Sequence, residues 1–328
     1  MARQPLGIAI LGTGQAARLH SVTLRRLGGV RLLHGSRERD RARRFAAAQG
    51  GGQAFGSYAE AIAAADTDVV LVTTPPPSHR DLACAALRQG RDVILEKPAL
   101  LRADHFAELR REAAAAGRRV LVAENYHYKP LVSCLRRLLA EDAVGDPIVV
   151  RVNALKSQAG GGWRDDPAQA GGGALFEGGI HWVCFMTSLG LEPVDATGFC
   201  RYDERGLDRT VAAVFRYEGG AVGSLAYSWE VPSLLRGVRL SSIHGTRGRI
   251  DFESNGLFVA CSGRRRRLQF PDLRDLAGYR AMFRDFVRVL REGGEPAYTL
   301  AAAERDLRLV ERIHARSGPR SPRSAGAV

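Results

Sequence analysis

The sequence predicts an α/β protein with an N-terminal, doubly wound parallel sheet and a C-terminal α+β domain whose open sheet is mainly antiparallel. Residues 1–125 alternate short apolar runs with segments of helical spacing, which is typical of parallel strands buried on both faces. Residues 126–316 hold longer stretches in which polar and apolar residues alternate, which indicates strands with one exposed face. The chain of 328 residues also exceeds the roughly 250–300 residues that one hydrophobic core usually serves. Residues 317–328 are rich in Ser, Pro, Gly and Arg and are predicted to form a disordered tail.

In the N-terminal domain the expected elements alternate between strand and helix. Ser57 and Glu60 have the spacing of a helix start, whereas Gly90 and Gly117 stand where a left-handed residue ends a helix. Strands are expected at 6–11, 30–35, 68–73, 93–95 and 120–123, and helices at 15–27, 37–49, 79–89 and 104–116.

In the C-terminal domain a first helix is followed by eight expected strands, with one helix inserted near 176–189. Gly219 and Gly220 are a hairpin signal between two of these strands. The helices are expected at 131–140, 277–291 and 299–315, and the strands at 148–154, 194–202, 210–217, 221–229, 238–244, 249–252, 258–261 and 267–270.

Composition and charge argue against several classes of partner. The formal net charge is +13, and 45 of the 48 basic residues are arginines. The arginine cluster at 264–267 lacks the interleaved aromatic residues of a nucleic-acid platform, so we expect no nucleic-acid partner. No apolar run reaches the roughly 18–20 residues that span a bilayer, so no membrane partner is expected, and the N-terminus is interpreted as a strand and not a signal peptide. Five widely spaced cysteines without a C-x-x-C motif predict a cytoplasmic protein with reduced thiols.

The segment from Gly12 to Ala17 follows an apolar strand, opens a helix and fits the pattern G-x-G-x-x-A. The first glycine permits a tight turn, and Gly14 lets a pyrophosphate approach the backbone. The small Ala17 lets the helix pack on the strand, and the helix N-terminus faces the phosphates. This context predicts a dinucleotide-binding loop.

The end of the second strand predicts which dinucleotide is bound. An NAD-binding domain places an acidic residue there to accept hydrogen bonds from the ribose 2′-hydroxyl, but this chain has Ser36 followed by Arg37. A hydroxyl and a guanidinium suit a 2′-phosphate, which a carboxylate would repel. The sequence therefore favours NADP(H) over NAD(H). In the alternative interpretation, Ser36 merely caps the next helix and Arg37 is solvated.

Lys97 stands between Glu96 and Pro98 at the carboxyl end of a buried strand, the edge of a doubly wound sheet where ligands bind. An ammonium can share a proton with a reacting hydroxyl, which an arginine cannot do. In a chain with only three lysines, this position is a candidate catalytic site. The alternative is a lysine that extends its charge from the strand end into solvent.

Further motifs follow the glycine loop: Thr74-Pro75-Pro76 with His79, Glu96-Lys97-Pro98, Glu124-Asn125-Tyr126, Trp163-Arg164, and a glycine-rich segment from Gly171 to Trp182. Together with His20 they resemble the Gfo/Idh/MocA oxidoreductases, which include glucose-fructose oxidoreductase and inositol dehydrogenase. The likeness covers nearly the whole chain except the final dozen residues. It implies a Rossmann domain, a substrate-binding α+β domain whose sheet forms a homodimer or homotetramer, and closing helices that pack back toward the N-terminal domain. It also implies hydride transfer between a nicotinamide and a sugar, cyclitol or related alcohol or ketone. In such an enzyme Lys97 would lie beside the nicotinamide and the substrate hydroxyl, and His181 would be the acid or base.

Glu177 and His181 are four residues apart and share a face if their segment is an α-helix. A carboxylate beside an imidazole orients it, and an imidazole that titrates near neutral pH can exchange a proton with an alcohol. The family commonly has Asp where this chain has Glu177, which leaves open whether Glu177 contacts substrate or only supports His181. The alternatives for His181 are a core histidine or half of a metal site, and no metal is expected because only two ligands are local.

The predicted catalytic residues are therefore Lys97, His181 and Glu177. The predicted cofactor-binding residues are Gly12, Thr13, Gly14, Gln15, Ala16, Ser36, Arg37, Thr74, Pro75, His79, Glu96 and Lys97. The predicted substrate-binding residues are Asn125, Tyr126, Trp163, Arg164, Glu177 and His181, although Trp163 could equally anchor its loop by packing. The function expected is an NADP(H)-dependent oxidoreductase of a small molecule, with the reductive direction favoured. The alternatives are a non-catalytic NADP(H)-binding regulator, or a lyase or glycosidase that borrows hydride and returns it.

Overall fold

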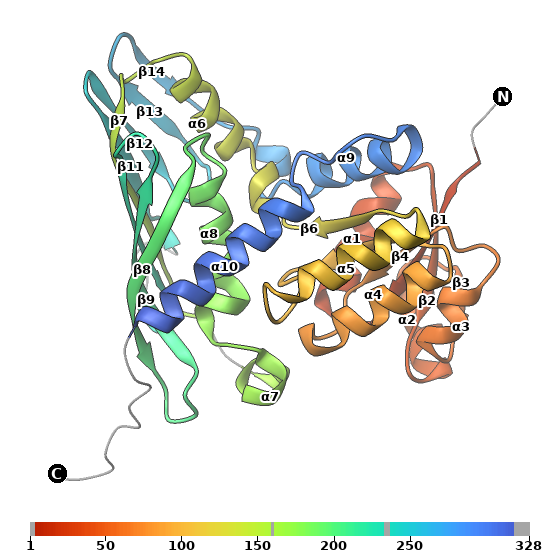
Figure 1. Ribbon diagram of the computed structural model, residues 1–328. Coiled ribbons are helices and arrows are strands. Elements are labelled where there is room, and N and C mark those ends of the chain that lie inside the picture. The colour runs from red at the N-terminus through yellow and green to blue at the C-terminus, as the bar shows by residue number, and fades with distance from the viewer. Residues whose placement is uncertain (1–3, 159–160, 233–236, 318–328) are drawn as a thin grey trace. The chain divides into compact units, whose positions relative to one another are not determined.

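The computed structural model describes residues 4–158, 161–232 and 237–317, so the predicted tail from residue 318 onward lies outside the described residues. The chain forms two compact units, each with its own sheet. Unit 1 comprises Met1–Glu124 and Tyr279–Glu304, and unit 2 comprises Asn125–Gly278 and Arg305–Val328. The predicted domain boundaries stay a prediction. Figure 1 labels most of the elements of both units.

Unit 1 is built from a parallel sheet with helices on both faces. Its strands are β1 (Leu6–Leu11), β2 (Val30–Gly35), β3 (Gln53–Phe55), β4 (Val69–Val72), β5 (Asp92–Glu96) and β6 (Val120–Ala123). Its helices are α1 (Gln15–Leu27), α2 (Arg39–Ala48), α3 (Tyr58–Ala63), the 3-10 turn Pro76–Ser78, α4 (His79–Arg88), α5 (His105–Ala116) and α9 (Tyr279–Glu292).

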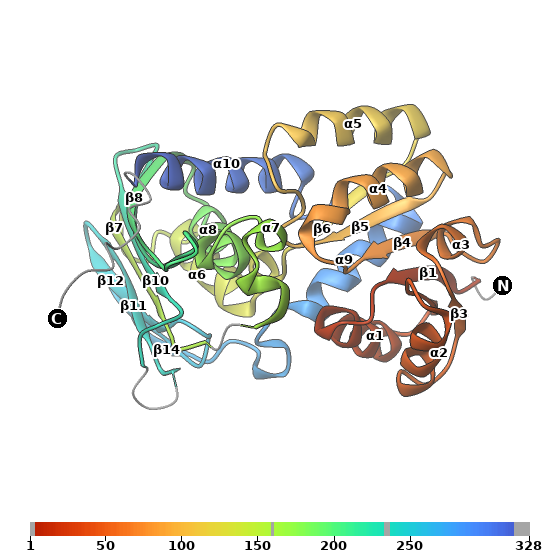
Figure 2. The same cartoon turned by 90° about the horizontal axis from the view of Figure 1, so that it is seen from below.

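The strand order of this sheet is β3-β2-β1-β4-β5-β6, and every pair is parallel. This is the order of a Rossmann fold, in which the strand order reverses beside β1. All four residues of β4 are buried, because helices cover both faces: α4 and α5 lie on one side, and α1 and α9 on the other (Figure 2). The carboxyl ends of β1, β2, β4 and β5 meet at one edge of the sheet, and the predicted cofactor-binding residues follow these strand ends.

Unit 2 combines an eight-stranded sheet with helices. Its strands are β7 (Pro147–Leu155), β8 (Pro193–Tyr202), β9 (Asp208–Tyr217), β10 (Val222–Ser228), β11 (Leu240–Gly245), β12 (Gly248–Glu253), β13 (Val259–Ser262) and β14 (Arg266–Gln269). Its helical segments are the turn Asn125–Tyr128, α6 (Pro130–Ala140), the turn Gly162–Asp165, α7 (Pro167–Ala170), a π-helical turn (Leu175–Gly179), α8 (Ile180–Thr187), the turn Leu273–Asp275 and, from Arg305 on, α10 (Leu300–Arg316).

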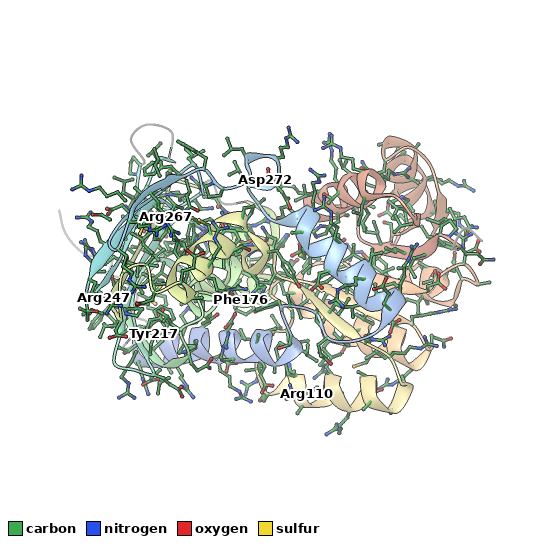
Figure 3. The ribbon with its side chains drawn as sticks, turned by 90° about the horizontal axis from the view of Figure 1, so that it is seen from above. Arg110, Phe176, Tyr217, Arg247, Arg267 and Asp272 are labelled. Carbon is green, nitrogen blue, oxygen red and sulfur yellow. The ribbon has the colours of Figure 1, made fainter. Side chains whose placement is uncertain are left out.

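The sheet of unit 2 has the order β14-β13-β12-β11-β7-β10-β9-β8, and only its β7–β10 pair is parallel. Helix α8 packs on one face, where Phe185 stacks on Phe252 of β12 with ring centroids 5.9 Å apart. Phe176 and Tyr217, both labelled in Figure 3, are buried on the same side, and the Tyr217 hydroxyl donates to the Met186 carbonyl oxygen at 3.2 Å. The predicted fold class is therefore confirmed.

Candidate active-site and cofactor-binding residues

The glycine loop of unit 1 has the backbone and the open space that a dinucleotide phosphate requires. Gly12 has a φ of +114°, and a Cβ there would lie 2.8 Å from Thr73 Oγ1, so the position favours glycine. A Cβ at Gly14 would meet no atom within 4 Å. Helix α1 begins at the next residue without a side-chain cap or an acidic residue in its first turn. The backbone N–H groups of this turn therefore fit an anionic group, as the sequence predicts.

Two arginines follow β2, one just after the strand and one in α2. Ser36 is buried directly after the strand, and Arg37 is exposed. Arg41, four residues further on in α2, donates from Nε to Thr13 Oγ1 at 2.8 Å. Burial raises the pKa of the Tyr58 hydroxyl, while the nearby charges of Arg37 and Arg41 lower it, so both guanidinium groups act on the same phenol. Sequence reasoning missed Arg41, although its spacing from Arg37 was a usable signal.

Glu96 fixes the backbone at Lys97. Its Oε2 accepts a hydrogen bond from the Lys97 backbone N–H at 2.6 Å, and its Oε1 lies 2.8 Å from His20 Nε2. Both carboxylate oxygens are thus engaged at the end of β5, and Glu96 is only 9% exposed. The structure gives Glu96 a positioning role toward the predicted catalytic lysine.

His79 joins the chain after β4 to the chain after β5. Its Nε2 lies 2.7 Å from the Thr74 carbonyl oxygen, and its Nδ1 lies 3.0 Å from that of Pro98 and 3.2 Å from that of Ala99. The side chain is buried, so its contacts are with these turns. Its role in cofactor binding stays a prediction.

In unit 2 the predicted proton donor His181 stacks on an aromatic ring. The His181 and Tyr126 rings have centroids 4.5 Å apart at an interplanar angle of 15°. Tyr126 comes from the turn after β6, and the Lys129 ammonium lies 4.4 Å from the centroid of its ring. Lys129 is buried, and Trp182 contacts both Tyr126 and Lys129. The predicted residues Tyr126 and His181 therefore lie together. Lys129, which directly precedes α6, joins them, and no sequence pattern pointed to it.

Glu177 lies in a π-helical turn, which corrects the expectation of a continuous α-helix through Glu177 and His181. A π turn bonds residues five apart, so the four-residue spacing does not define a shared face there. The Glu177 carboxylate accepts a hydrogen bond from Arg164 Nε at 3.1 Å, and the Arg164 guanidinium lies 4.7 Å from the centroid of the Trp163 ring. Arg164 thus contacts two other predicted substrate-binding residues, Trp163 and Glu177.

The remaining predicted substrate-binding residue, Asn125, has a structural partner in unit 2. Its Nδ2 donates to the Ala277 carbonyl oxygen at 2.6 Å, and the side chain is buried. This bond ties the turn after β6 to the loop before α9. A contact between Asn125 and substrate stays a prediction.

Asp208 anchors the segment that carries Glu177 and His181. This buried carboxylate accepts hydrogen bonds from the backbone N–H groups of Gly173 at 3.1 Å and Leu175 at 2.7 Å. Its Oδ1 lies 2.9 Å from Nε2 of His314 in α10. Sequence reasoning missed both residues, because they lie 33 to 106 positions from their partners.

Burial raises the pKa of the Tyr227 hydroxyl well above its usual range, and the charge of Glu177 adds to this effect. The hydroxyl accepts a hydrogen bond from Trp229 Nε1 at 2.7 Å. Tyr227 therefore stays protonated, and its side chain packs against Gly178 and Gly179 of the π turn.

The described part of the chain shows neither a cluster of metal ligands nor a membrane-spanning helix. Within residues 4–158, 161–232 and 237–317, no group of three or more His, Cys, Asp or Glu side chains is placed to hold a metal ion. Over the same residues, no helix combines the length and the apolar character needed to cross a membrane.

Two models of one protein family match most of the chain. Residues 6–124 match the oxidoreductase family with an NAD-binding Rossmann fold, and residues 132–251 match the GFO/IDH/MocA C-terminal domain. Among curated proteins, the trans-1,2-dihydrobenzene-1,2-diol dehydrogenase of Sus scrofa is 33% identical over 215 residues, which cover 65% of this chain and 63% of the relative. The match thus spans less than two thirds of that relative's length.

Solved structures share the fold over nearly their whole length. An oxidoreductase from Thermotoga maritima is 25% identical with a TM-score of 0.84, over 96% of this chain and 97% of that one. The aldose-aldose oxidoreductase of Caulobacter crescentus, complexed with glycerol, is 22% identical with a TM-score of 0.85, over 96% and 98%. With both of its parts matched by family models, the chain belongs to the Gfo/Idh/MocA family of oxidoreductases.

Proposed function

We propose that this protein is an NADP(H)-dependent oxidoreductase that transfers hydride between nicotinamide and a sugar, cyclitol or related hydroxy or keto compound, in the reductive direction. Family membership supports the reaction class, and the similarity to an enzyme named for a diol and to another named for aldoses supports a polyol-like substrate. All five cysteines lie outside disulfides, which suits a reducing cytoplasm, the location that we propose.

One observation carries the choice of NADP(H): the cluster of Ser36, Arg37 and Arg41 beside the glycine loop. The Arg41 guanidinium already contacts Thr13 within that loop. Arg37 and Arg41 would hold the 2′-phosphate by charge-assisted hydrogen bonds, and the Ser36 hydroxyl would donate another. A carboxylate at the position of Ser36 would instead repel this phosphate.

The catalytic roles follow from the chemistry of each side chain. Bound nicotinamide supplies or accepts the hydride. The Lys97 ammonium, on a backbone held by Glu96, hydrogen-bonds the reacting oxygen, and His181 gives that oxygen its proton or removes it. The Tyr126 ring orients the imidazole by stacking. Glu177, paired with Arg164, binds substrate hydroxyls or supports His181.

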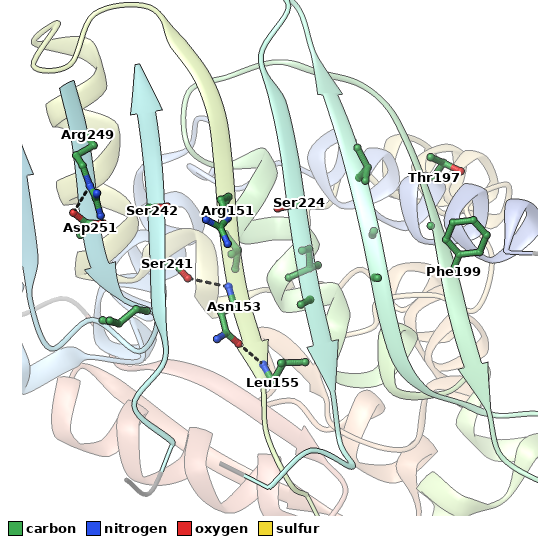
Figure 4. Close-up of a pocket in the computed structure, with 18 residues that line it drawn as sticks. Arg151, Asn153, Leu155, Thr197, Phe199, Ser224, Ser241, Ser242, Arg249 and Asp251 are labelled. Carbon is green, nitrogen blue, oxygen red and sulfur yellow. Dashed lines mark hydrogen bonds and ion pairs between the residues drawn. The ribbon is translucent and has the colours of Figure 1, made fainter. Parts of the chain in front are cut away.

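We also propose a homo-oligomer in which a second copy covers the open face of the unit 2 sheet. Figure 4 shows this face, where a hollow of about 620 Å³ is lined by residues of β7 to β12. Exposed apolar side chains, including Phe199, Val214 and Leu240, lie around it. Arg249 and Asp251 neutralise each other at 2.7 Å, so this part of the face suits burial against a second copy.

The binding experiment compares NADPH and NADH affinities by fluorescence titration. We expect the native chain to bind NADPH more tightly, and Arg37→Ala and Arg41→Ala each to reduce that preference by about 10- to 150-fold, because a hydrogen bond to a charged group contributes ~1.5–3 kcal/mol. Arg44→Ala, an exposed arginine on the same helix, is the matched control and should change neither affinity. If the NADPH-to-NADH ratio is the same in the native chain and in both arginine variants, the assignment of the 2′-phosphate is wrong.

A further inference from the structure

The hairpin that joins β13 to β14 borders a hollow of about 430 Å³ in unit 2. Arg264, Arg265 and Arg267 line this hollow from the hairpin, and Glu141 and Ala143 line it from the loop after α6. We name it the arginine hollow. None of its residues is among those predicted to bind cofactor or substrate, so the proposed function does not account for it.

Backbone hydrogen bonds hold the two sides of the arginine hollow together. The Arg264 N–H donates to the Ala143 carbonyl oxygen at 3.1 Å. The Arg247 N–H, from the turn between β11 and β12, donates to the Val144 carbonyl oxygen at 2.8 Å. A Cβ on Gly263 would lie 2.2 Å from the Ala143 carbonyl oxygen, so the close approach of hairpin and loop requires glycine there. The arginines therefore extend from ordered backbone, which lowers the entropic cost of binding a ligand.

Two carboxylates orient three of the arginines. Glu141 Oε2 lies 2.6 Å from Arg267 Nη1. Asp142, in a left-handed conformation with a φ of +56°, pairs with Arg247 and lies 3.9 Å from Arg264 Nη1. Figure 3 labels Arg247 and Arg267. These ion pairs hold the guanidinium groups beside the hollow.

The carboxylates do not neutralise the cluster. Arg137 also belongs to it, since its Nε lies 3.9 Å from Glu141 Oε1. Arg265 and Arg266 form no ion pair with any acidic residue that the structure describes. Two carboxylates thus stand against six arginines, an excess of four positive charges, and the six are Arg137, Arg247 and residues 264–267. A bound anion would relieve the repulsion among these charges.

The lining of the arginine hollow indicates which kind of anion fits. The residues described there include no aromatic and no large apolar side chain, so they offer no surface on which a base could stack. Guanidinium groups present paired N–H donors that match the oxygens of a phosphate group. The donor set therefore suits the phosphoryl group itself and not a ring attached to it.

We propose that the arginine hollow binds a compact anion through its phosphoryl oxygens, which Arg264, Arg265 and Arg267 hold. Two sources share this chemistry, namely free pyrophosphate and the phosphate group of a phosphorylated sugar. The site shares no residue with the predicted cofactor and substrate sites, so the proposal does not rest on the proposed function.

Isothermal titration calorimetry of the full chain with inorganic pyrophosphate tests the site. The titration is made in excess NADPH, because the glycine loop also fits a phosphate. We expect saturable binding, and we expect Arg265→Ala to weaken it by about 10-fold or more, because a charge-assisted hydrogen bond is lost. Arg265 has no acidic partner among the described residues, so its removal leaves no carboxylate unpaired and the thermal unfolding midpoint should stay native. Arg274→Ala, an exposed arginine of the turn Leu273–Asp275, is the matched control and should keep the native affinity.

Two further probes distinguish the sources. Glucose 6-phosphate is titrated in parallel, and the probe that binds more tightly identifies whether the site prefers pyrophosphate or a sugar phosphate. Binding of neither probe in excess NADPH, or equal affinity in the native chain and Arg265→Ala, would overturn the proposal. A single-stranded DNA that binds more tightly than both probes, and loses affinity in Arg265→Ala, would overturn it in favour of a nucleic-acid surface.

Discussion

At the scale of residues, the account depends most on Lys97. Arginine is the ordinary cation of this chain, and only three positions carry lysine. Lys97 follows a buried strand, and its backbone N–H donates to Glu96 at 2.6 Å. An arginine would keep the charge at this position but could not share a proton with a substrate oxygen, because its pKa is too high. We therefore expect Lys97 to act through its ability to share a proton.

The first prediction follows from this difference. We expect Lys97→Met and Lys97→Arg each to lower kcat by about 100-fold or more while the affinity for NADPH stays within a few-fold of native, because proton-sharing catalysis contributes ~10²–10⁴. Stopped-flow kinetics measures the turnover rate, and equilibrium titration measures the affinity for NADPH. If Lys97→Arg keeps most of the native rate, charge alone suffices and the proton-sharing role is lost.

A second residue predicts how stability depends on pH. Burial, helped by the charge of Arg25, lowers the pKa of His34 in the Rossmann sheet from 6.5 to about 4. The folded state therefore binds fewer protons than the unfolded state between these values, and stability falls as the pH falls from about 6.5 to about 4. The loss expected is roughly 3 kcal/mol. Urea unfolding of the native chain and of His34→Leu at pH 7 and pH 4 measures it, and the same loss in both proteins would refute the assignment.

At the scale of elements, the glycine-rich segment before α8 matters most. It forms a π turn, a feature that often occurs at functional sites. Asp208 holds its start through two backbone N–H groups, and Tyr227 lies against its two glycines. A Cβ on Gly178 would collide with the Tyr227 hydroxyl, so close packing requires glycine there. The glycines of this segment bring Glu177 and the helix of His181 close to the sheet.

Two glycines should respond differently to the same substitution. Gly178→Ala should destabilise the protein by ~1–3 kcal/mol, because the added methyl group overpacks a buried contact. Gly14→Ala should leave stability nearly unchanged, since its methyl group meets no atom within 4 Å, but should weaken NADPH binding. Denaturation and coenzyme titration of both variants provide the comparison. Equal stability losses would contradict this account of the two sites.

The elements also show what the sequence could predict. Short-range patterns sufficed for β1, the glycine loop, and the start of α3, where Ser57 accepts from the Glu60 N–H as expected. Strand β3, with three residues, was missed because it is too short to show a period. The parallel pairing of β7 with β10 and the role of Asp208 depend on partners far along the chain, which no local pattern reveals. The π turn resembles an α-helix in composition, so it was predicted as one.

At the scale of the whole molecule, the net charge of +13 opposes the association of two copies, whereas the open sheet face favours it. Several arginines of unit 2 pair with carboxylates, as Arg267 does with Glu141 at 2.6 Å. The open face carries several exposed apolar residues, of which Phe199 is 78% exposed, beside Arg151 and the paired Arg249 and Asp251. Surface of this kind in the interior of a sheet face suits contact with a second copy.

The proposed interface can be tested by adding positive charge to the open face of the unit 2 sheet. Phe199→Arg combined with Leu240→Arg should shift the native oligomer toward monomer, because two desolvated cations per chain would oppose association. Light scattering after size-exclusion chromatography measures the molar mass of the oligomer. Leu273→Arg, an exposed leucine outside the sheet, is the control and should retain the native mass. A monomeric native chain, or an unchanged mass in the double variant, would contradict the proposed interface.

The central claim is that this protein reduces a carbonyl group of a polyol-like compound with NADPH. The most direct measurement mixes the native chain with NADPH and a panel of keto-sugars, inososes and simple ketones, and records the absorbance of the reduced nicotinamide together with product formation. The account predicts that at least one keto-sugar or inosose consumes NADPH in a one-to-one ratio with product, and that His181→Asn abolishes this turnover. Product formed with the NADPH total unchanged, or NADPH binding without chemistry across the panel, would contradict it.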